Sequence, residues 1–215
     1  PFDGVLVGSG DRENPLDKAS RSSASASGGS ADDYFFLIKD RNVLPGTGAD
    51  LNRSFSELTD ISTNTCLIRN SPVACDVNVD LGWKLKLQLG TGEKVLATAT
   101  TFGNTVFFTS YLPPKSSAAA TCGPGEGSGA LYAVSLDDGA AAFDFNKSDN
   151  VPGDTTGDSN SLADRIDALA SGGIPAQVVF IPAGSTGLSY IRPDLNIDTP
   201  PVSNRYRTFW QRLEQ

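Results

Sequence analysis

The chain has 215 residues, no His, no Met, three Cys and a formal net charge of −8. Hydrophobic residues make up 39% of it and Gly and Pro are frequent, which excludes a disordered acidic tail, a collagen-like rod and a long helical bundle. No run of about 18 apolar residues is present, so a helical membrane span is excluded. An acidic chain without a basic stretch is a poor candidate for nucleic-acid binding. The absence of His removes the commonest general base and a frequent metal ligand.

The first residues predict a short strand close to the start of the chain. Pro1 leads directly into Val5-Leu6-Val7-Gly8-Ser9-Gly10, which we interpret as a buried strand running into a Gly turn. No Met, basic segment or cleavage site precedes it, so we expect the chain to be an internal piece of a longer protein. Any targeting signal would then lie elsewhere.

A low-complexity segment separates this strand from the next one. Residues 19–31 contain only Ala, Ser, Gly and one Arg, and they predict a mobile loop because they have nothing to bury. Residues 34–39, with the sequence YFFLIK, form a continuous apolar run that ends at Asp40-Arg41. This run predicts a second buried strand.

Four further strands are predicted between residues 83 and 136. The segment WKLKLQL at 83–89 alternates between apolar and polar residues, which is typical of a half-buried strand. The other strands are predicted at 95–100, 105–111 and 130–136, and Gly103-Asn104 predicts a tight turn. We interpret the four as one antiparallel meander with the size of a propeller blade. Four strands of a sandwich or barrel are the alternative.

The last third of the chain predicts one short helix and one hairpin. The helix is expected at residues 161–170, with Ser161 as its cap and apolar residues on one face: Leu162, Ile166 and Leu169. Strands at 177–181 and 188–191 are expected to pair across the intervening loop. At about 45–50 residues per blade, the length holds about four blades, so we expect an incomplete ring.

Three cysteines give the chain its clearest covalent prediction. Cys66 and Cys75 lie nine positions apart, and a disulfide between them would contribute about 2–3 kcal/mol and indicate an oxidising compartment. Two free thiols are the alternative, and zinc is disfavoured because no further Cys pair or His completes four ligands. Cys122 remains either as a free thiol or as the partner of a Cys outside this chain.

Tests for chemistry along the sequence assign no catalytic, cofactor-binding or metal-binding residue. Asp149, Asp154 and Asp158 could offer oxygen ligands to calcium, but they lack the alternating Asp-x-Asp-x-Asp-Gly spacing and favour a solvated loop. Gly8-Ser9-Gly10 lacks the rest of a phosphate-binding loop. Without His, a Ser-His-Asp triad cannot form. A carboxylate pair for glycoside hydrolysis stays open, although no spacing selects one.

The opening segment VLVGSGDRENPLD, at residues 5–17, resembles the opening of one blade in the C-terminal domain of PilY-type proteins. These proteins are type IV pilus biogenesis factors and tip adhesins. Each matching piece is short, but the order and spacing of the series make the resemblance specific over almost the whole chain. The other segments are GWKL at 82–85, GEKVLA at 92–97, VFFTSY at 106–111, GALYAV at 129–134, GIPAQVV at 173–179, IRPDL at 191–195 and RTFW at 207–210.

The resemblance implies that residues 1–215 are the C-terminal part of a single all-β domain, a quinoprotein-like β-propeller with four-stranded blades. Residues 133–139 with Phe143 are similar to the blade motif Ala-x-Asp-x-x-Thr-Gly-x-x-x-Trp. Ser135, Asp138 and Phe143 depart from it, so the docking between blades is expected to differ. The Asp-rich calcium loop of the family has no match, and no cofactor is therefore expected in this segment.

The resemblance also implies a function at the cell surface or pilus tip (the fimbrium), reached by secretion through the periplasm. The protein would promote pilus assembly, counter retraction in twitching motility and mediate cell adhesion, with minor pilins and host or abiotic surfaces as partners. It would act through contacts of its loops at 19–31, 113–129 and 149–160 and not as an enzyme. A quinone-dependent periplasmic oxidoreductase and a carbohydrate-binding propeller are the alternatives, both argued from shape alone.

Overall fold

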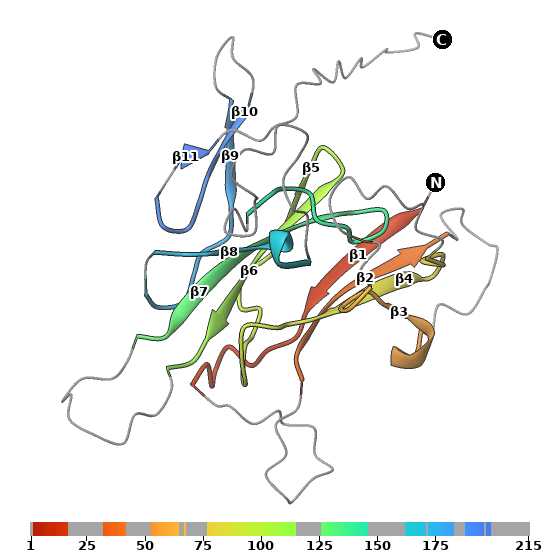
Figure 1. Ribbon diagram of the computed structural model, residues 1–215, viewed down its shortest axis with the longest axis horizontal. Helices are drawn as coiled ribbons and strands as arrows, with labels where there is room; N and C mark the ends of the chain where they lie inside the picture. The colour runs from red at the N-terminus through yellow and green to blue at the C-terminus, as the bar shows by residue number, and fades with distance from the viewer. Residues whose placement is uncertain are drawn as a thin grey trace, which may run out of the picture.

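The protein has an all-β fold, shown as a computed structural model in Figure 1. Its secondary structure forms three sheets in the described part of the chain, called A, B and C below, and the sheets do not close into a barrel. The described residues are 2–16, 32–41, 53–64, 67, 77–114, 126–145, 162–170, 172–182, 188–195 and 197–198. No helix among them is long and apolar enough to cross a membrane.

Most neighbouring strands in the three sheets are antiparallel, and β3 alone among the described strands runs parallel to its neighbour, β4. Sheet A has the order β1 (Asp3–Gly8), β2 (Tyr34–Asp40), β4 (Gly82–Lys86) and β3 (Thr59–Asp60). Sheet B has the order β5 (Thr100–Phe102), β6 (Thr105–Leu112), β7 (Ser128–Ser135) and β8 (Ile166–Ala168). Sheet C has the order β11 (Ile197–Asp198), β10 (Leu188–Ile191) and β9 (Val179–Pro182).

Sheet B lies between the other two sheets, and its two central strands are buried on both faces (Figure 1). Alternate residues of a strand point to opposite faces, so Phe108 and Tyr132 face sheet A, whereas Phe107 faces sheet C. This position explains why the segments VFFTSY and ALYAV are nearly continuous apolar runs.

Aromatic rings fill both layers between the sheets. Between A and B, the rings of Phe35 and Phe108 stack with their centroids 3.8 Å apart, and Phe108 stacks in turn on Tyr132. Between B and C, Phe107 contacts Phe180 and Tyr190 at centroid distances of 5.2 and 5.3 Å. Burying one such side chain is worth about 1.5–3 kcal/mol, so these layers stabilise the arrangement of the sheets.

The predicted meander is wrong in its first two strands. The strand at Trp83 belongs to sheet A, where it pairs with Leu37 of β2. The predicted strand at 95–100 is replaced by an isolated bridge between Lys94 and Tyr111 and by the shorter β5. Sheet B completes its four strands with β8 instead. Alternation along a strand fixes which residues share a face, but it does not choose the neighbouring strand.

The predicted helix at 161–170 is also wrong. The structure has a 3-10 turn, η4 (Leu162–Arg165), followed directly by β8. In β8, Ile166 pairs with Tyr132 and Ala168 with Ala130, so the segment supplies an outer strand to sheet B. A ten-residue helix is marginal on its own, and the backbone bonds offered by β7 are available only in the folded chain.

The turn at Gly103-Asn104 and the predicted pairing of the strands at 177–181 and 188–191 are confirmed. Gly103 and Asn104 have φ values of 56° and 65°, as a hairpin turn with positive φ at both central residues requires. β9 pairs with β10, and β1 and β2 occupy the expected segments. The prediction that the first strand is buried is wrong, because Val5 and Val7 are exposed in β1.

The segment after β7 docks sheet B onto sheet A. The indole Nε1 of Trp83 donates to Leu136 O over 3.3 Å, and Lys39 Nζ donates to Asp137 O over 2.7 Å. Gly139 lies against Ile61 with a φ of +72°. Phe143, which stands where the blade motif has Trp, packs against Phe107 in the layer between B and C. Backbone carbonyls of this segment therefore join sheet B to sheet A, whereas Phe143 packs on the opposite face of sheet B.

Candidate functional site

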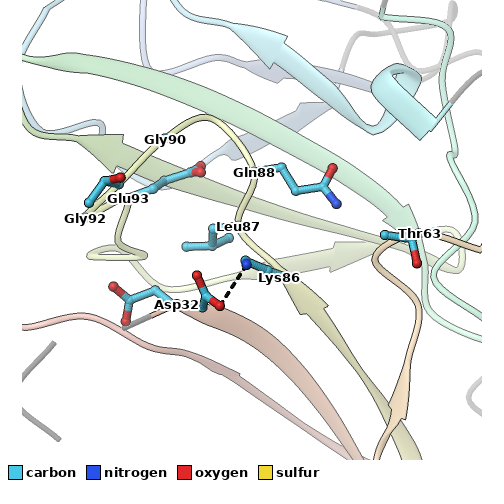
Figure 2. Close-up of a pocket in the computed structure, with 10 residues that line it drawn as sticks. Asp32, Thr63, Lys86, Leu87, Gln88, Gly90, Gly92 and Glu93 are labelled. Carbon is cyan, nitrogen blue, oxygen red and sulfur yellow. Dashed lines mark ion pairs between the residues drawn. The ribbon is translucent and has the colours of Figure 1, made fainter. Parts of the chain in front are cut away.

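A polar hollow of about 440 Å³ opens where β2 and β4 meet the turn that follows β4. Figure 2 shows its residues converging from these elements and from the segment after β3. The lining is rich in carboxylate, hydroxyl and amide groups. Its members are Asp32, Asp33, Thr63, Lys86, Leu87, Gln88, Gly90, Thr91, Gly92 and Glu93.

Glu93 forms the buried wall of the hollow, with only 1% of its surface exposed. Its Oε2 accepts a hydrogen bond from the Leu89 backbone N–H over 2.7 Å, and its Oε1 accepts one from the Tyr132 hydroxyl over 2.8 Å. Burial raises the pKa of the Glu93 carboxyl, because the charged form loses hydration. The side chain therefore holds the turn after β4 to strand β7 of sheet B.

The rim of the hollow carries an ion pair and a second anchored carboxylate. Lys86 Nζ lies 2.7 Å from Asp32 Oδ2 (Figure 2), and this hydrogen bond raises the pKa of Lys86. Asp33 Oδ1 accepts a hydrogen bond from Ser9 Oγ over 2.7 Å, and the same Oγ accepts one from the Tyr34 N–H. The three acidic side chains of the lining thus all have protein partners.

The carboxylates of the hollow contribute both to its surface and to the fold around it. The acidic lining can offer oxygen atoms to a cationic or hydroxyl-bearing group, but its carboxylates are used to order the surrounding turns. In the described part of the chain, no group of three or more His, Cys, Asp or Glu side chains could hold a metal ion.

The Gly-rich segment after β1 has a structural role that sequence reasoning missed. Ser9 O accepts a hydrogen bond from the Val95 N–H over 2.9 Å, and Arg12 Nη1 donates to Leu96 O over 2.9 Å. A Cβ on Gly8 would lie 2.4 Å from the Val95 side chain, so only Gly permits this approach. The segments at 5–17 and 92–97 both belong to the series that resembles PilY-type proteins. No other pattern in the sequence indicates that they are in contact.

The residues considered for a disulfide and for calcium binding lie outside the described part of the chain. Cys66, Cys75 and Cys122 all fall there, as do the candidate calcium ligands Asp149, Asp154 and Asp158. The predicted contact loops at 19–31 and 149–160 fall there entirely, and of the loop at 113–129 the structure describes only its two ends.

Sequence reasoning selected none of Lys86, Glu93 and Asp32, because no motif spacing sets them apart from the other charged residues of the chain. It likewise missed Arg165, which is only 2% exposed and donates from Nη1 to Ile61 O over 2.9 Å. Desolvation lowers the pKa of Arg165 to about 10. This cation joins the segment before β8 to sheet A.

Comparison with known proteins gives one structural likeness. No family model matches the chain, and no curated protein matches it. The fold is similar to the crystal structure of the Pseudomonas aeruginosa PilY1 C-terminal domain, with a TM-score of 0.49 and 12% sequence identity. The similarity covers 88% of this chain and 40% of that one, so this chain spans less than half of that domain's length.

Proposed function

We propose that this chain is part of a type IV pilus biogenesis protein that works at the pilus tip or cell surface through contact surfaces. The observation that carries the proposal is the mutual packing of segments that resemble the PilY family. The segment at 5–17 binds the segment at 92–97 through Ser9, Arg12, Val95 and Leu96.

Other members of the series are also in contact with one another. The segments at 106–111 and 129–134 pair as β6 and β7. Thr109 Oγ1 donates to Ala176 O over 3.2 Å, which joins the segment at 173–179 to β6. Trp83, in the segment at 82–85, lies with its ring tilted against that of Phe35 in the core shared with sheet B, with the ring centroids 6.1 Å apart. The segments of the series thus build one scaffold, which supports the proposal.

On this proposal the protein promotes pilus assembly, counters retraction and mediates attachment, with minor pilins and host or abiotic surfaces as its partners. We propose that it acts through contacts and not as an enzyme. Loops between strands commonly carry binding residues, and we propose this role for the loops at 19–31, 113–129 and 149–160. A Cys66–Cys75 disulfide would fit a protein secreted through the periplasm.

Deletion of the gene tests the role in piliation. We expect loss of surface pili and of twitching motility, both restored by the wild-type gene supplied in trans. Piliation and twitching at the level of the parent strain would contradict the proposal. Extraction of cofactor from the purified protein tests the oxidoreductase alternative, since a bound quinone would contradict a role in contact alone.

Peptide mass spectrometry without reduction tests the proposed compartment. Protein isolated from its native source should yield a peptide pair that links Cys66 to Cys75. Recovery of both cysteines as alkylated free thiols would remove the argument for an oxidising environment while leaving the piliation experiment unaffected.

A further inference from the structure

Strand β1 is an edge of sheet A. In the described part of the chain it pairs with β2 alone, over six residues from Asp3↔Asp40 to Gly8↔Phe35. An edge strand presents a row of backbone N–H and C=O groups that can pair with another chain. Figure 1 shows β1 on the side of the sheet away from β4 and β3.

The register identifies which backbone groups face outward. Ser9 N–H donates to Tyr34 O over 2.8 Å, in continuation of the β1–β2 register. Hydrogen-bonded pairs alternate along an antiparallel ladder, so Val5 and Val7 direct their backbone groups to β2. The N–H and C=O groups of Gly4 and Leu6 consequently point to the open edge.

The side chains of β1 leave this edge accessible. Val5 is 51% exposed and Val7 is 43% exposed, and both lie on the face of the sheet that is turned away from sheet B. The strand contains no Lys and no Pro, which natural edge strands commonly use to prevent pairing.

The strand also packs closely against its neighbours on the inner side. A Cβ on Gly4 would lie 3.1 Å from Leu37 Cδ1, and a Cβ on Gly8 would overlap the Val95 side chain. The backbone of β1 therefore lies close against its neighbours, and an incoming strand would meet an edge that is already formed. Such preorganisation reduces the entropic cost of binding.

Acidic side chains lie at both ends of β1. Asp3 and Asp40 face each other in register at one end, and just beyond the other end lie Asp33, which accepts a hydrogen bond from Ser9, and Asp32, which is paired with Lys86. The whole chain has a net charge of −8, so pairing between two copies would bring acidic groups together. A partner segment with basic residues at its ends complements this charge.

We propose that β1 binds an extended segment of a partner polypeptide by strand addition. The segment would alternate apolar and polar residues and carry Lys or Arg at both ends. Backbone bonds to Gly4 and Leu6 would supply affinity, and contacts with Val5 and Val7 would select apolar side chains. The inference does not depend on the pilus assignment, because peptide binding and piliation are measured separately.

Binding of a defined peptide to the full chain tests the proposal. The probe is a fluorescently labelled octapeptide of alternating Val and Thr with Lys at both ends, followed by fluorescence anisotropy. We expect saturable binding, with amide hydrogen exchange slowed at Gly4 and Leu6. A V5K/V7K double variant should weaken binding about tenfold or more, because it adds charge that repels the peptide. Both replaced side chains are exposed, so the variant should fold, as circular dichroism would verify.

The control variant is Ile174→Lys, which adds the same kind of charge at a side chain that is 46% exposed and lies outside the strands of the three sheets. It should bind the peptide like the wild type. Absence of saturable binding, or equal binding by V5K/V7K, would overturn the proposal. Equal binding of a peptide with Glu at both ends would overturn the basic character of the partner. A concentration-dependent dimer in light scattering that V5K/V7K abolishes would show a second copy as the occupant.

Discussion

The Tyr132 hydroxyl donates a hydrogen bond to Oε1 of Glu93 over a distance of 2.8 Å, and both residues are almost completely buried. This bond crosses from strand β7 of sheet B to the turn after β4 of sheet A. It places a carboxylate in a poorly hydrated position, where the charged form is disfavoured. The stability of the junction should consequently depend on pH.

Glu93→Gln is expected to remove one pH-dependent contribution to stability. Because burial raises the pKa of Glu93 above its ordinary 4.5, the folded state binds the proton more tightly than the unfolded state. The contribution is fully present below pH 4.5 and is lost as pH rises through the raised value. The free energy of unfolding of the wild type relative to Glu93→Gln should therefore increase on acidification. Urea unfolding between about pH 4 and pH 8 measures this difference.

Glu57→Gln provides a control of opposite sign. Hydrogen bonds from the backbone and side chain of Ser54 lower the pKa of Glu57, so its contribution is present at neutral pH and is lost on acidification. The free energy of unfolding of the wild type relative to Glu57→Gln should therefore decrease on acidification. If the difference between the wild type and Glu93→Gln also decreased on acidification, the role assigned to Glu93 would be contradicted.

Gly139→Ala should destabilise the docking of sheet B on sheet A. The residue has a φ of +72°, and a Cβ there would lie 2.0 Å from Ile61 Cδ1. Backbone strain of this kind costs about 1–3 kcal/mol, and the steric overlap adds to it. Chemical denaturation of the single variants and of the double variant with Ile61→Val forms a thermodynamic cycle. Removal of Cδ1 should recover part of the loss, and purely additive effects would contradict the contact.

Arg165→Met should leave the stability almost unchanged or raise it. The guanidinium is buried, and its Nε and Nη2 have no hydrogen-bond partner among the described residues. Replacing an incompletely satisfied buried cation by an apolar side chain of similar length is often neutral or stabilising. Arg165→Ala, by contrast, leaves a cavity and should cost about 2–4 kcal/mol. Equal losses in thermal unfolding for the two variants would show that the charge itself is required.

Leu195→Gly should stabilise the hairpin between β10 and β11. Leu195 has a φ of 66° and is 82% exposed, so the substitution relieves backbone strain without removing core packing. The left-handed conformation costs a non-Gly residue about 1–2 kcal/mol. Gly avoids this cost, but its greater flexibility in the unfolded chain offsets part of the gain. The matched variant Leu195→Ala keeps the strain and should not gain stability. A lower melting temperature for Leu195→Gly would contradict this expectation.

Local signals were sufficient for several parts of the fold. The apolar runs at 34–39 and 105–111 became β2 and β6, and Gly103-Asn104 formed the turn between β5 and β6. The helix predicted at 161–170 does not form, because Ile166 and Ala168 pair with β7 instead. The apolar periodicity of this segment is a local signal, and it does not reveal that pairing. The site was less predictable, since Asp32, Lys86 and Glu93 come together only where separate strands end.

The sequence by itself determined that the protein is acidic, rich in β-strands and without His, and where most of its strands lie. These properties follow from composition and from the two-residue period of a strand, which are local. Only the tertiary structure decided that the strand at Trp83 joins sheet A, that sheet B is covered on both faces, and that β1 is an edge with exposed Val5 and Val7. Strand neighbours are chosen by long-range packing and backbone pairing, and a pattern within one segment does not contain that information.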